Sequence, residues 1–137
     1  MSRKNAKMLN ETFKKINTES SNIKICQETQ KTARELANFG YNTNSAILED
    51  LNDEINELKD ELNADNKHRI EEELGDVVFV LCNLANQYGI DLDKSLNYST
   101  KEFQRRLVYI ENKINGSLKD LDNSEIVKLW KEAKNNK

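Results

Sequence analysis

Two pairs of acidic residues have the spacing of a metal site. Glu54 and Glu57 lie three residues apart, and so do Glu73 and Asp76. Side chains at positions i and i+3 of a helix project from one face, so each pair can present two carboxylates to the same point. If the four carboxylates converge, with no His or Cys among them, they form an oxygen-only site. Such a site suits Mg²⁺ or Mn²⁺ rather than Zn²⁺.

Two helices must bring these pairs together. Apolar residues recur at helical spacing before the loop NADN, and a second helix is predicted after it, from about Lys67 to Tyr88. From Val77 onward this second helix is apolar on nearly every side, which predicts that it is the most buried helix. In an antiparallel hairpin closed by the loop, the glutamates at positions 57 and 73 each lie eight residues from Asp65 and therefore at similar heights.

An ordinary solvated helix start is the alternative interpretation. Acidic residues are favoured in a first helical turn because they meet the positive end of the helix dipole. This effect accounts for Glu71 and Glu72, but it explains Asp76 poorly, because Asp76 directly precedes an apolar run in which an unpaired charge is costly. The spacing alone leaves both interpretations open.

The composition indicates a helical fold. The chain has 137 residues, no Pro and 4 Gly, with 33% charged and 36% hydrophobic residues. This composition favours long helices joined by short polar loops. We therefore expect an all-α bundle of four to five helices in one domain, residues 19–137. The polar and basic segment 1–18 is predicted to be a flexible arm that can become helical against this domain.

The other helices also have start and stop signals. A helix is expected on each side of the central pair, followed by a short last helix. Ser, Thr, Asn and Asp side chains accept hydrogen bonds at helix starts, and Gly is common just after a helix end. The residues expected at these ends are Ser20, Ser21, Gly40, Asn44 or Ser45, Asp91 or Asp93, Gly116 and Asp122.

Charge and cysteine usage narrow the class of protein. The net charge of −3 is too small to recruit nucleic acid or an anionic membrane surface, so neither is an expected partner. Cys26 and Cys82 lie far apart among helical apolar neighbours, which favours buried, reduced thiols and a cytoplasmic location. The start of the sequence has no apolar core of a signal peptide, and the longest apolar run, VVFVLC, is too short for a membrane span.

Three segments resemble the MazG family of all-α nucleoside triphosphate pyrophosphohydrolases: LNDEINELKDEL, RIEEELGDVVFVLCNLANQYGIDLDKSLNYSTKEFQRRLVYIE and SEIVKLWKEAK. The resemblance runs over about residues 25–134. It implies hydrolysis of a nucleoside triphosphate between the α and β phosphates with Mg²⁺, giving the monophosphate and pyrophosphate. The family motif, ExxE followed by ExxD, falls on Glu54, Glu57, Glu73 and Asp76, which it implies are the metal ligands. Glu72, in preference to its neighbour at position 71, is the residue expected to orient or deprotonate the attacking water.

The resemblance also implies a set of substrate-binding residues. The family usually has Lys before the aromatic residue of its KFxRR segment, but Glu102 stands there in this chain, and Thr100 replaces a usual Asn. Lys101 or Arg105 is expected to bind the phosphate in place of that Lys. The complete set is Arg69, Lys101, Arg105, Arg106, Trp130 and Lys134.

These assignments have structural alternatives. Arg69 can balance Glu73 as an i,i+4 pair, Arg106 can be a surface residue, Trp130 can anchor the last helix, and Lys134 can favour a helix end. Asn83 and Asn86, inside the apolar helix, are either interhelical hydrogen-bonders or nucleotide contacts. A homodimer or higher homo-oligomer is expected from the family. A dUTPase-like, dCTPase-like or phosphoribosyl-ATP pyrophosphohydrolase, or a degenerate helical binding module, is the alternative function.

Overall fold

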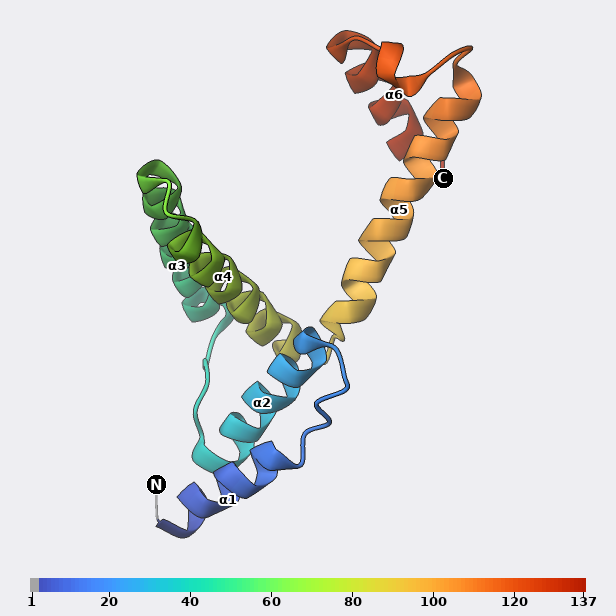
Figure 1. The fold of residues 1–137 in the computed structure, drawn as a ribbon. Coiled ribbons are helices and arrows are strands. Elements are labelled where there is room, and N and C mark those ends of the chain that lie inside the picture. The colour runs from blue at the N-terminus through green and yellow to red at the C-terminus, as the bar shows by residue number, and fades with distance from the viewer. Residues whose placement is uncertain (1–2) are drawn as a thin grey trace. The chain divides into compact units, whose positions relative to one another are not determined.

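The computed structural model describes residues 3–137, with side chains from residue 8 onward, and this range contains only helices (Figure 1). The predicted all-α class is confirmed. There is one more α-helix than the four to five predicted, because a helix forms in the segment expected as an arm. The elements are α1 (Arg3–Lys14), α2 (Asn22–Ala37), α3 (Asn44–Ala64), α4 (Lys67–Gln87), α5 (Leu92–Lys113), the 3₁₀-helix η1 (Leu118–Asp120) and α6 (Asn123–Asn135).

The chain divides into two compact units, Met1–Asp93 and Lys94–Lys137. The first unit holds α1 to α4, and the second holds most of α5 together with η1 and α6. No helix among residues 3–137 is both long and apolar enough to cross a membrane.

Helices α3 and α4 form the hairpin on which the carboxylate prediction depends. The two helices pack side by side along their length (Figure 1). Asp65 reverses the chain between them in a left-handed conformation, with φ of 54°. The side chain of Asn66 then accepts a hydrogen bond from the backbone N–H of Arg69 and caps α4. The antiparallel arrangement expected from the NADN loop is therefore confirmed.

Two predicted helix ends are wrong by one or two residues. Helix α2 has its C-cap at Asn38, which adopts the left-handed conformation with φ of 51°, and not at Gly40. Asn tolerates this conformation better than most residues, so the helix ends before the glycine is reached. Helix α3 is capped by Thr43, which has an extended backbone, and not by Asn44 or Ser45. The predicted caps at Ser21 and Asp122 are confirmed.

A network of side-chain amides holds α2 against α4. Gln27 donates to Oδ1 of Asn86 at 3.0 Å, and Asn86 donates to Oε1 of Gln30 at 3.0 Å and to the backbone carbonyl of Gln27 at 3.2 Å. Gln30 in turn donates to the backbone carbonyl of Phe79 at 2.8 Å. Both glutamines are buried, and their amides are paired as buried polar groups must be. Of the two roles that the sequence left open for Asn86, the structure shows hydrogen bonding between helices.

Helix α4 is less completely buried than its apolar sequence predicted. It contributes more buried residues than any other helix in the described chain, including Val80, Cys82 and Ala85. However, Leu74, at 51% exposure, and Val78, at 42%, remain open to solvent. The reason is that within this unit α4 packs mainly against α2 and α3, which cover part of its circumference.

The two thiols give a test of this packing. Both cysteines are free, and burial raises the pKa of each thiol, that of Cys82 to about 12. Because the thiolate is the reactive form, we expect Cys82 to resist an aromatic disulfide reagent near neutral pH in the folded protein and to react promptly in guanidinium. The Cys26→Ser variant isolates this thiol for the measurement. Rapid labelling of the folded variant would show that α2 does not cover α4 as described.

Candidate functional site

Three carboxylates converge where α3 faces α4. One oxygen each from Glu54, Glu57 and Glu73 lies within 4.8 Å of the other two. Glu73 is buried at 8% exposure, Glu54 is half-buried and Glu57 is exposed. The hairpin creates this carboxylate cluster because it places glutamates from two helices at the same height, as the equal distances to the turn predicted.

The electrostatics of the carboxylate cluster are unfavourable without a cation. Oε2 of Glu54 and Oε2 of Glu73 are buried and have no hydrogen-bond partner among the described residues. Burial, followed by the charge of Glu57, raises the pKa of Glu54 to about 7 and raises the pKa of Glu73 as well. Buried, unpaired carboxylate oxygens close to other carboxylates are the donor set that a hard divalent cation binds. The cluster could therefore hold a metal ion.

Asp76 lies beside the carboxylate cluster without belonging to its three-oxygen core. Its charge contributes to the raised pKa of both Glu54 and Glu73. Its side chain is on the exposed surface of α4, one turn after Glu73. The fourth carboxylate of the predicted set is therefore within electrostatic reach of the cluster, on its solvent side.

Glu72 and Arg69 make a separate surface network. The Glu72 carboxylate lies 3.0 Å from Nε2 of His68 and 3.7 Å from Nη1 of Arg69. Nε of Arg69 is also 3.5 Å from Oε1 of Glu61 on α3. In the described part of the chain, the ion pairs of Arg69 are thus with Glu61 and Glu72 and do not include Glu73. Arg69 lies one turn nearer the hairpin turn than Glu73, whereas Glu72 directly precedes Glu73 in α4.

In the second unit, Glu102 organises the arginines of α5. Its carboxylate is 3.2 Å from Nη2 of Arg105 and 3.9 Å from Nη2 of Arg106. The hydrogen bond from Arg105 is the main reason that the pKa of Glu102 is lowered. Arg105 also donates to the backbone carbonyls of Ala133 at 3.0 Å and Asn136 at 2.9 Å, so it holds the end of α6.

Trp130 packs between the helices of the second unit. Its ring centroid lies 5.7 Å from that of Phe103 and 5.2 Å from the guanidinium carbon of Arg106. Nε of Arg106 is buried and has no hydrogen-bond partner in the part of the chain that the structure describes. Trp130 thus anchors α6 on α5, as its structural alternative predicted. Lys101 and Lys134 are exposed.

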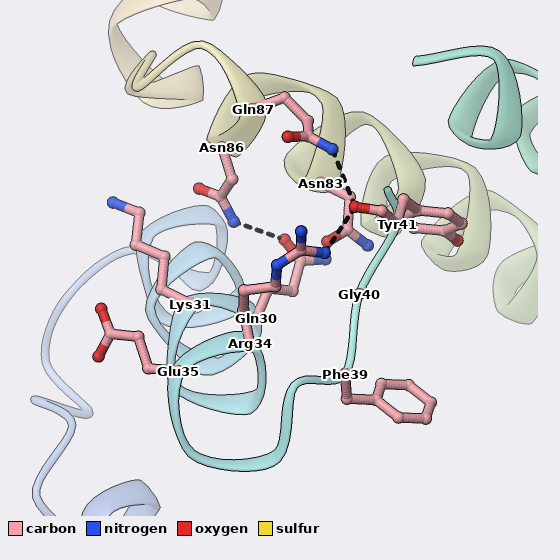
Figure 2. Close-up of a pocket in the computed structure, with 10 residues that line it drawn as sticks. All are labelled: Gln30, Lys31, Arg34, Glu35, Phe39, Gly40, Tyr41, Asn83, Asn86 and Gln87. Carbon is pink, nitrogen blue, oxygen red and sulfur yellow. Dashed lines mark hydrogen bonds between the residues drawn. The ribbon is translucent and has the colours of Figure 1, made fainter. Parts of the chain in front are cut away.

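Tyr41 is a neighbour of the carboxylate cluster that the sequence did not reveal. Its hydroxyl donates to Asp50, one helical turn before Glu54, and burial together with the charge of Asp50 raises the pKa of Tyr41 to about 12. Its backbone carbonyl accepts hydrogen bonds from Arg34 at 2.5 Å and Gln87 at 3.2 Å (Figure 2). The loop residue therefore ties α2, α3 and α4 together. In the sequence, the i,i+4 spacing of Asp50 and Glu54 indicates that Asp50 lies close to the carboxylate cluster, but it does not indicate the contact with Tyr41.

Replacing a buried member of the carboxylate cluster should have opposite effects with and without metal. In EDTA we expect Glu73→Gln to raise the midpoint of thermal unfolding by a few degrees, because it removes repulsion. With Mg²⁺ or Mn²⁺ the wild-type midpoint should rise and the midpoint of this variant should not, because binding to the folded state stabilises it. Glu71→Gln, exposed on the same helix, makes the same charge change outside the cluster. Equal behaviour of the two variants would contradict the cluster as a cation site.

The raised pKa of Glu54 predicts how stability depends on pH. With a pKa of about 7 in the folded state and an ordinary value of 4.5, the folded chain binds more protons than the unfolded chain between these pH values. In EDTA the free energy of unfolding should therefore fall as pH rises through this window. Excess divalent cation should reverse the trend, because it binds the deprotonated carboxylates. Guanidinium unfolding across the window measures both effects. If the free energy of unfolding of Glu54→Gln depended on pH as steeply as that of the wild type, Glu54 would not be the source of the trend.

Comparison with known proteins identifies the region that holds the carboxylate cluster. Residues 42–108 match the MazG nucleotide pyrophosphohydrolase domain. The uncharacterized protein YabN of Bacillus subtilis is 38% identical over 74 residues, which are 52% of this chain and 15% of that protein. The nucleoside triphosphate pyrophosphohydrolase/pyrophosphatase MazG of Thermotoga maritima is 25% identical over 115 residues, 82% of this chain and 44% of that protein.

The chain thus spans less than half the length of either of these relatives. The matched region nevertheless includes the whole α3–α4 hairpin, and it continues into α5. Its all-helical fold and its convergent glutamates agree with the resemblance found in the sequence. Residues 42–108 of this chain are therefore similar in sequence to the MazG nucleotide pyrophosphohydrolase domain.

Proposed function

We propose that this protein hydrolyses nucleoside triphosphates between the α and β phosphates, releasing the monophosphate and pyrophosphate. The carrying observation is the convergence of Glu54, Glu57 and Glu73, with two buried oxygens left unpaired among the described residues, inside the region that matches the MazG domain. The Thermotoga maritima relative is named a nucleoside triphosphate pyrophosphohydrolase/pyrophosphatase, which supports the substrate class. We further propose that Mg²⁺, or Mn²⁺ in its place, is held by these three glutamates and Asp76.

The proposed chemistry divides between the metal and the protein. A cation bound there would neutralise charge on the phosphate oxygens and make a bound water more acidic. Glu73 and the half-buried Glu54 would hold it, while Glu57 and Asp76, on the exposed side, leave the approach open for a triphosphate. We propose that Glu72 orients the attacking water. Its carboxylate has to leave its contacts with His68 and Arg69 to do so, and Arg69 then gains the freedom to meet a phosphate.

The remaining substrate-binding candidates of the proposal belong to the second unit. Arg106, Trp130 and Lys134 are the positions that match the substrate-binding pattern of the family. Glu102 stands where the family usually has a phosphate-binding Lys, and two neighbouring residues are candidates for that role. Arg105 is engaged with the end of α6, whereas Lys101 is exposed. We therefore favour Lys101 as the replacement.

The apolar surface of α4 supports a proposed homodimer. Leu74 and Val78 are adjacent on one helix face and remain about half-exposed. Burying such a face against a second copy of the chain removes apolar area from water, at roughly 25 cal/mol per Å². We also propose a cytoplasmic location and a role in controlling the nucleotide pool, in keeping with the reaction.

Product analysis tests the proposed reaction directly. The purified protein is incubated with a panel of ribo- and deoxyribonucleoside triphosphates, with Mg²⁺ or with EDTA. We expect the monophosphate and pyrophosphate, no turnover in EDTA, and a fall of at least about 100-fold in kcat for Asp76→Asn, as when one transition-state contact is removed. Glu71→Gln is the matched control and should retain activity. Release of orthophosphate would place the broken bond elsewhere, and the absence of turnover with either cation would reject the proposal.

A further inference from the structure

A hollow lies between α2, the loop after it, and α4, away from the carboxylates themselves. Its larger part has a volume of about 510 Å³ and is lined mainly by apolar groups, with the side chains of Phe39 and Phe79 among them. A smaller adjoining part is lined by polar residues of the same helices (Figure 2). Gln30, Tyr41 and Asn83 line both parts. The volume is within the range of small-molecule sites.

Several of the polar groups that line this hollow are paired with one another. The amides of Gln30 and Asn86 belong to the network between α2 and α4, and Gln87 and Arg34 bind the carbonyl of Tyr41. The side chain of Asn83, one turn before Asn86, makes no hydrogen bond to any residue that the structure describes, although it is half-buried and lines both parts. Its donor and acceptor are therefore available to a ligand.

Two phenylalanine side chains supply an apolar environment beside this amide. Phe39 is 78% exposed and Phe79 is 47% exposed, and both line the larger part of the hollow. Exposed aromatic rings next to a hydrogen-bonding amide suit a flat heterocycle that combines an apolar face with a polar edge. Nucleobases have this character: they stack on aromatic side chains, and an Asn amide can pair with a donor and an acceptor on their edge.

The hollow lies at a suitable position relative to the carboxylate cluster. Asn83 follows Asp76 by seven residues, so the two share one face of α4 about 10 Å apart along its axis. Tyr41, which forms part of the wall, donates its hydroxyl to Asp50, one turn from Glu54. A nucleotide carries its base and its phosphates at opposite ends of a sugar. A ligand with its phosphates at the cluster therefore extends its base toward this hollow.

We propose that the hollow is the nucleobase subsite, in which Phe39 and Phe79 contact the faces of the base and the Asn83 amide binds its hydrogen-bonding edge. This assignment rests on the proposed function for the identity of the ligand. Tyr41 acts as a positioning residue, because its hydroxyl and carbonyl fix the wall of the subsite relative to α3. Base selectivity then depends on Asn83 and is separable from the metal chemistry at the carboxylates.

Binding of nucleoside monophosphates in EDTA tests the subsite without any hydrolysis. Two-dimensional NMR spectra of the isotope-labelled wild-type protein are recorded with each of the four ribonucleoside monophosphates. We expect the side-chain amide signals of Asn83 and the backbone signals of residues 39–41 to shift with at least one base, while ribose 5-phosphate, which lacks the base, leaves them unchanged. Unshifted signals at saturating monophosphate, or equal shifts with ribose 5-phosphate, would overturn the subsite even if the protein is an active pyrophosphohydrolase.

The kinetic counterpart uses Asn83→Leu, which keeps the approximate volume and removes the hydrogen bonds. We expect kcat/KM for the preferred triphosphate to fall roughly 10-fold or more, chiefly through KM, with less discrimination among bases. Asn63→Leu, at an exposed position of α3, is the matched control. Unchanged base discrimination in Asn83→Leu would also overturn the subsite. If the protein hydrolyses no triphosphate, the NMR titration still decides whether this hollow binds a base.

Discussion

Mutual repulsion among carboxylates is the constraint on which the structure of the hairpin depends. Glu54, Glu57 and Glu73 present oxygens within 4.8 Å of one another, and burial makes the charges of Glu54 and Glu73 harder to accommodate. The unit keeps this arrangement because packing elsewhere on the two helices compensates for it: Ile47 on α3 and Val80 on α4 are among the most completely buried residues. The apolar contacts of α3 and α4 therefore serve to hold together side chains that would separate if they were free to do so.

The amide network of α2 defines the other side of α4. Gln27, Gln30 and Asn86 are polar groups in a place where apolar packing would also have been stable, but their paired donors and acceptors fix one angular setting of α2. Tyr41 extends the same framework to α3. Directional hydrogen bonds thus fix the side of α4 that faces α2, where the hollow lies. Apolar packing fixes the side that faces α3, where the carboxylates lie.

The sequence predicts correctly those features that depend on residue spacing within a helix. The hairpin, the caps at Ser21 and Asp122, and the convergence of three glutamates follow from spacings that local geometry fixes. The choice between Asn38 and Gly40 as the end of α2 did not follow, because both residue types tolerate a left-handed conformation. Nor did the difference between Asn83 and Asn86, since it depends on which face of α4 the glutamines of α2 meet, a tertiary property. The contact of Tyr41 with α3 comes from a loop, which carries no periodic signal.

The turn at Asp65 also limits how this sequence can change in length. Each residue added to α3 between Glu57 and the turn rotates the first glutamate pair by about 100° relative to the second and moves it about 1.5 Å along the axis. A single insertion therefore separates the pairs even if every helix still forms. Insertions of about seven residues in both arms restore the angular phase to within about 20°. Such paired insertions therefore preserve the arrangement of the two glutamate pairs, whereas the chain outside the hairpin is free of this restriction.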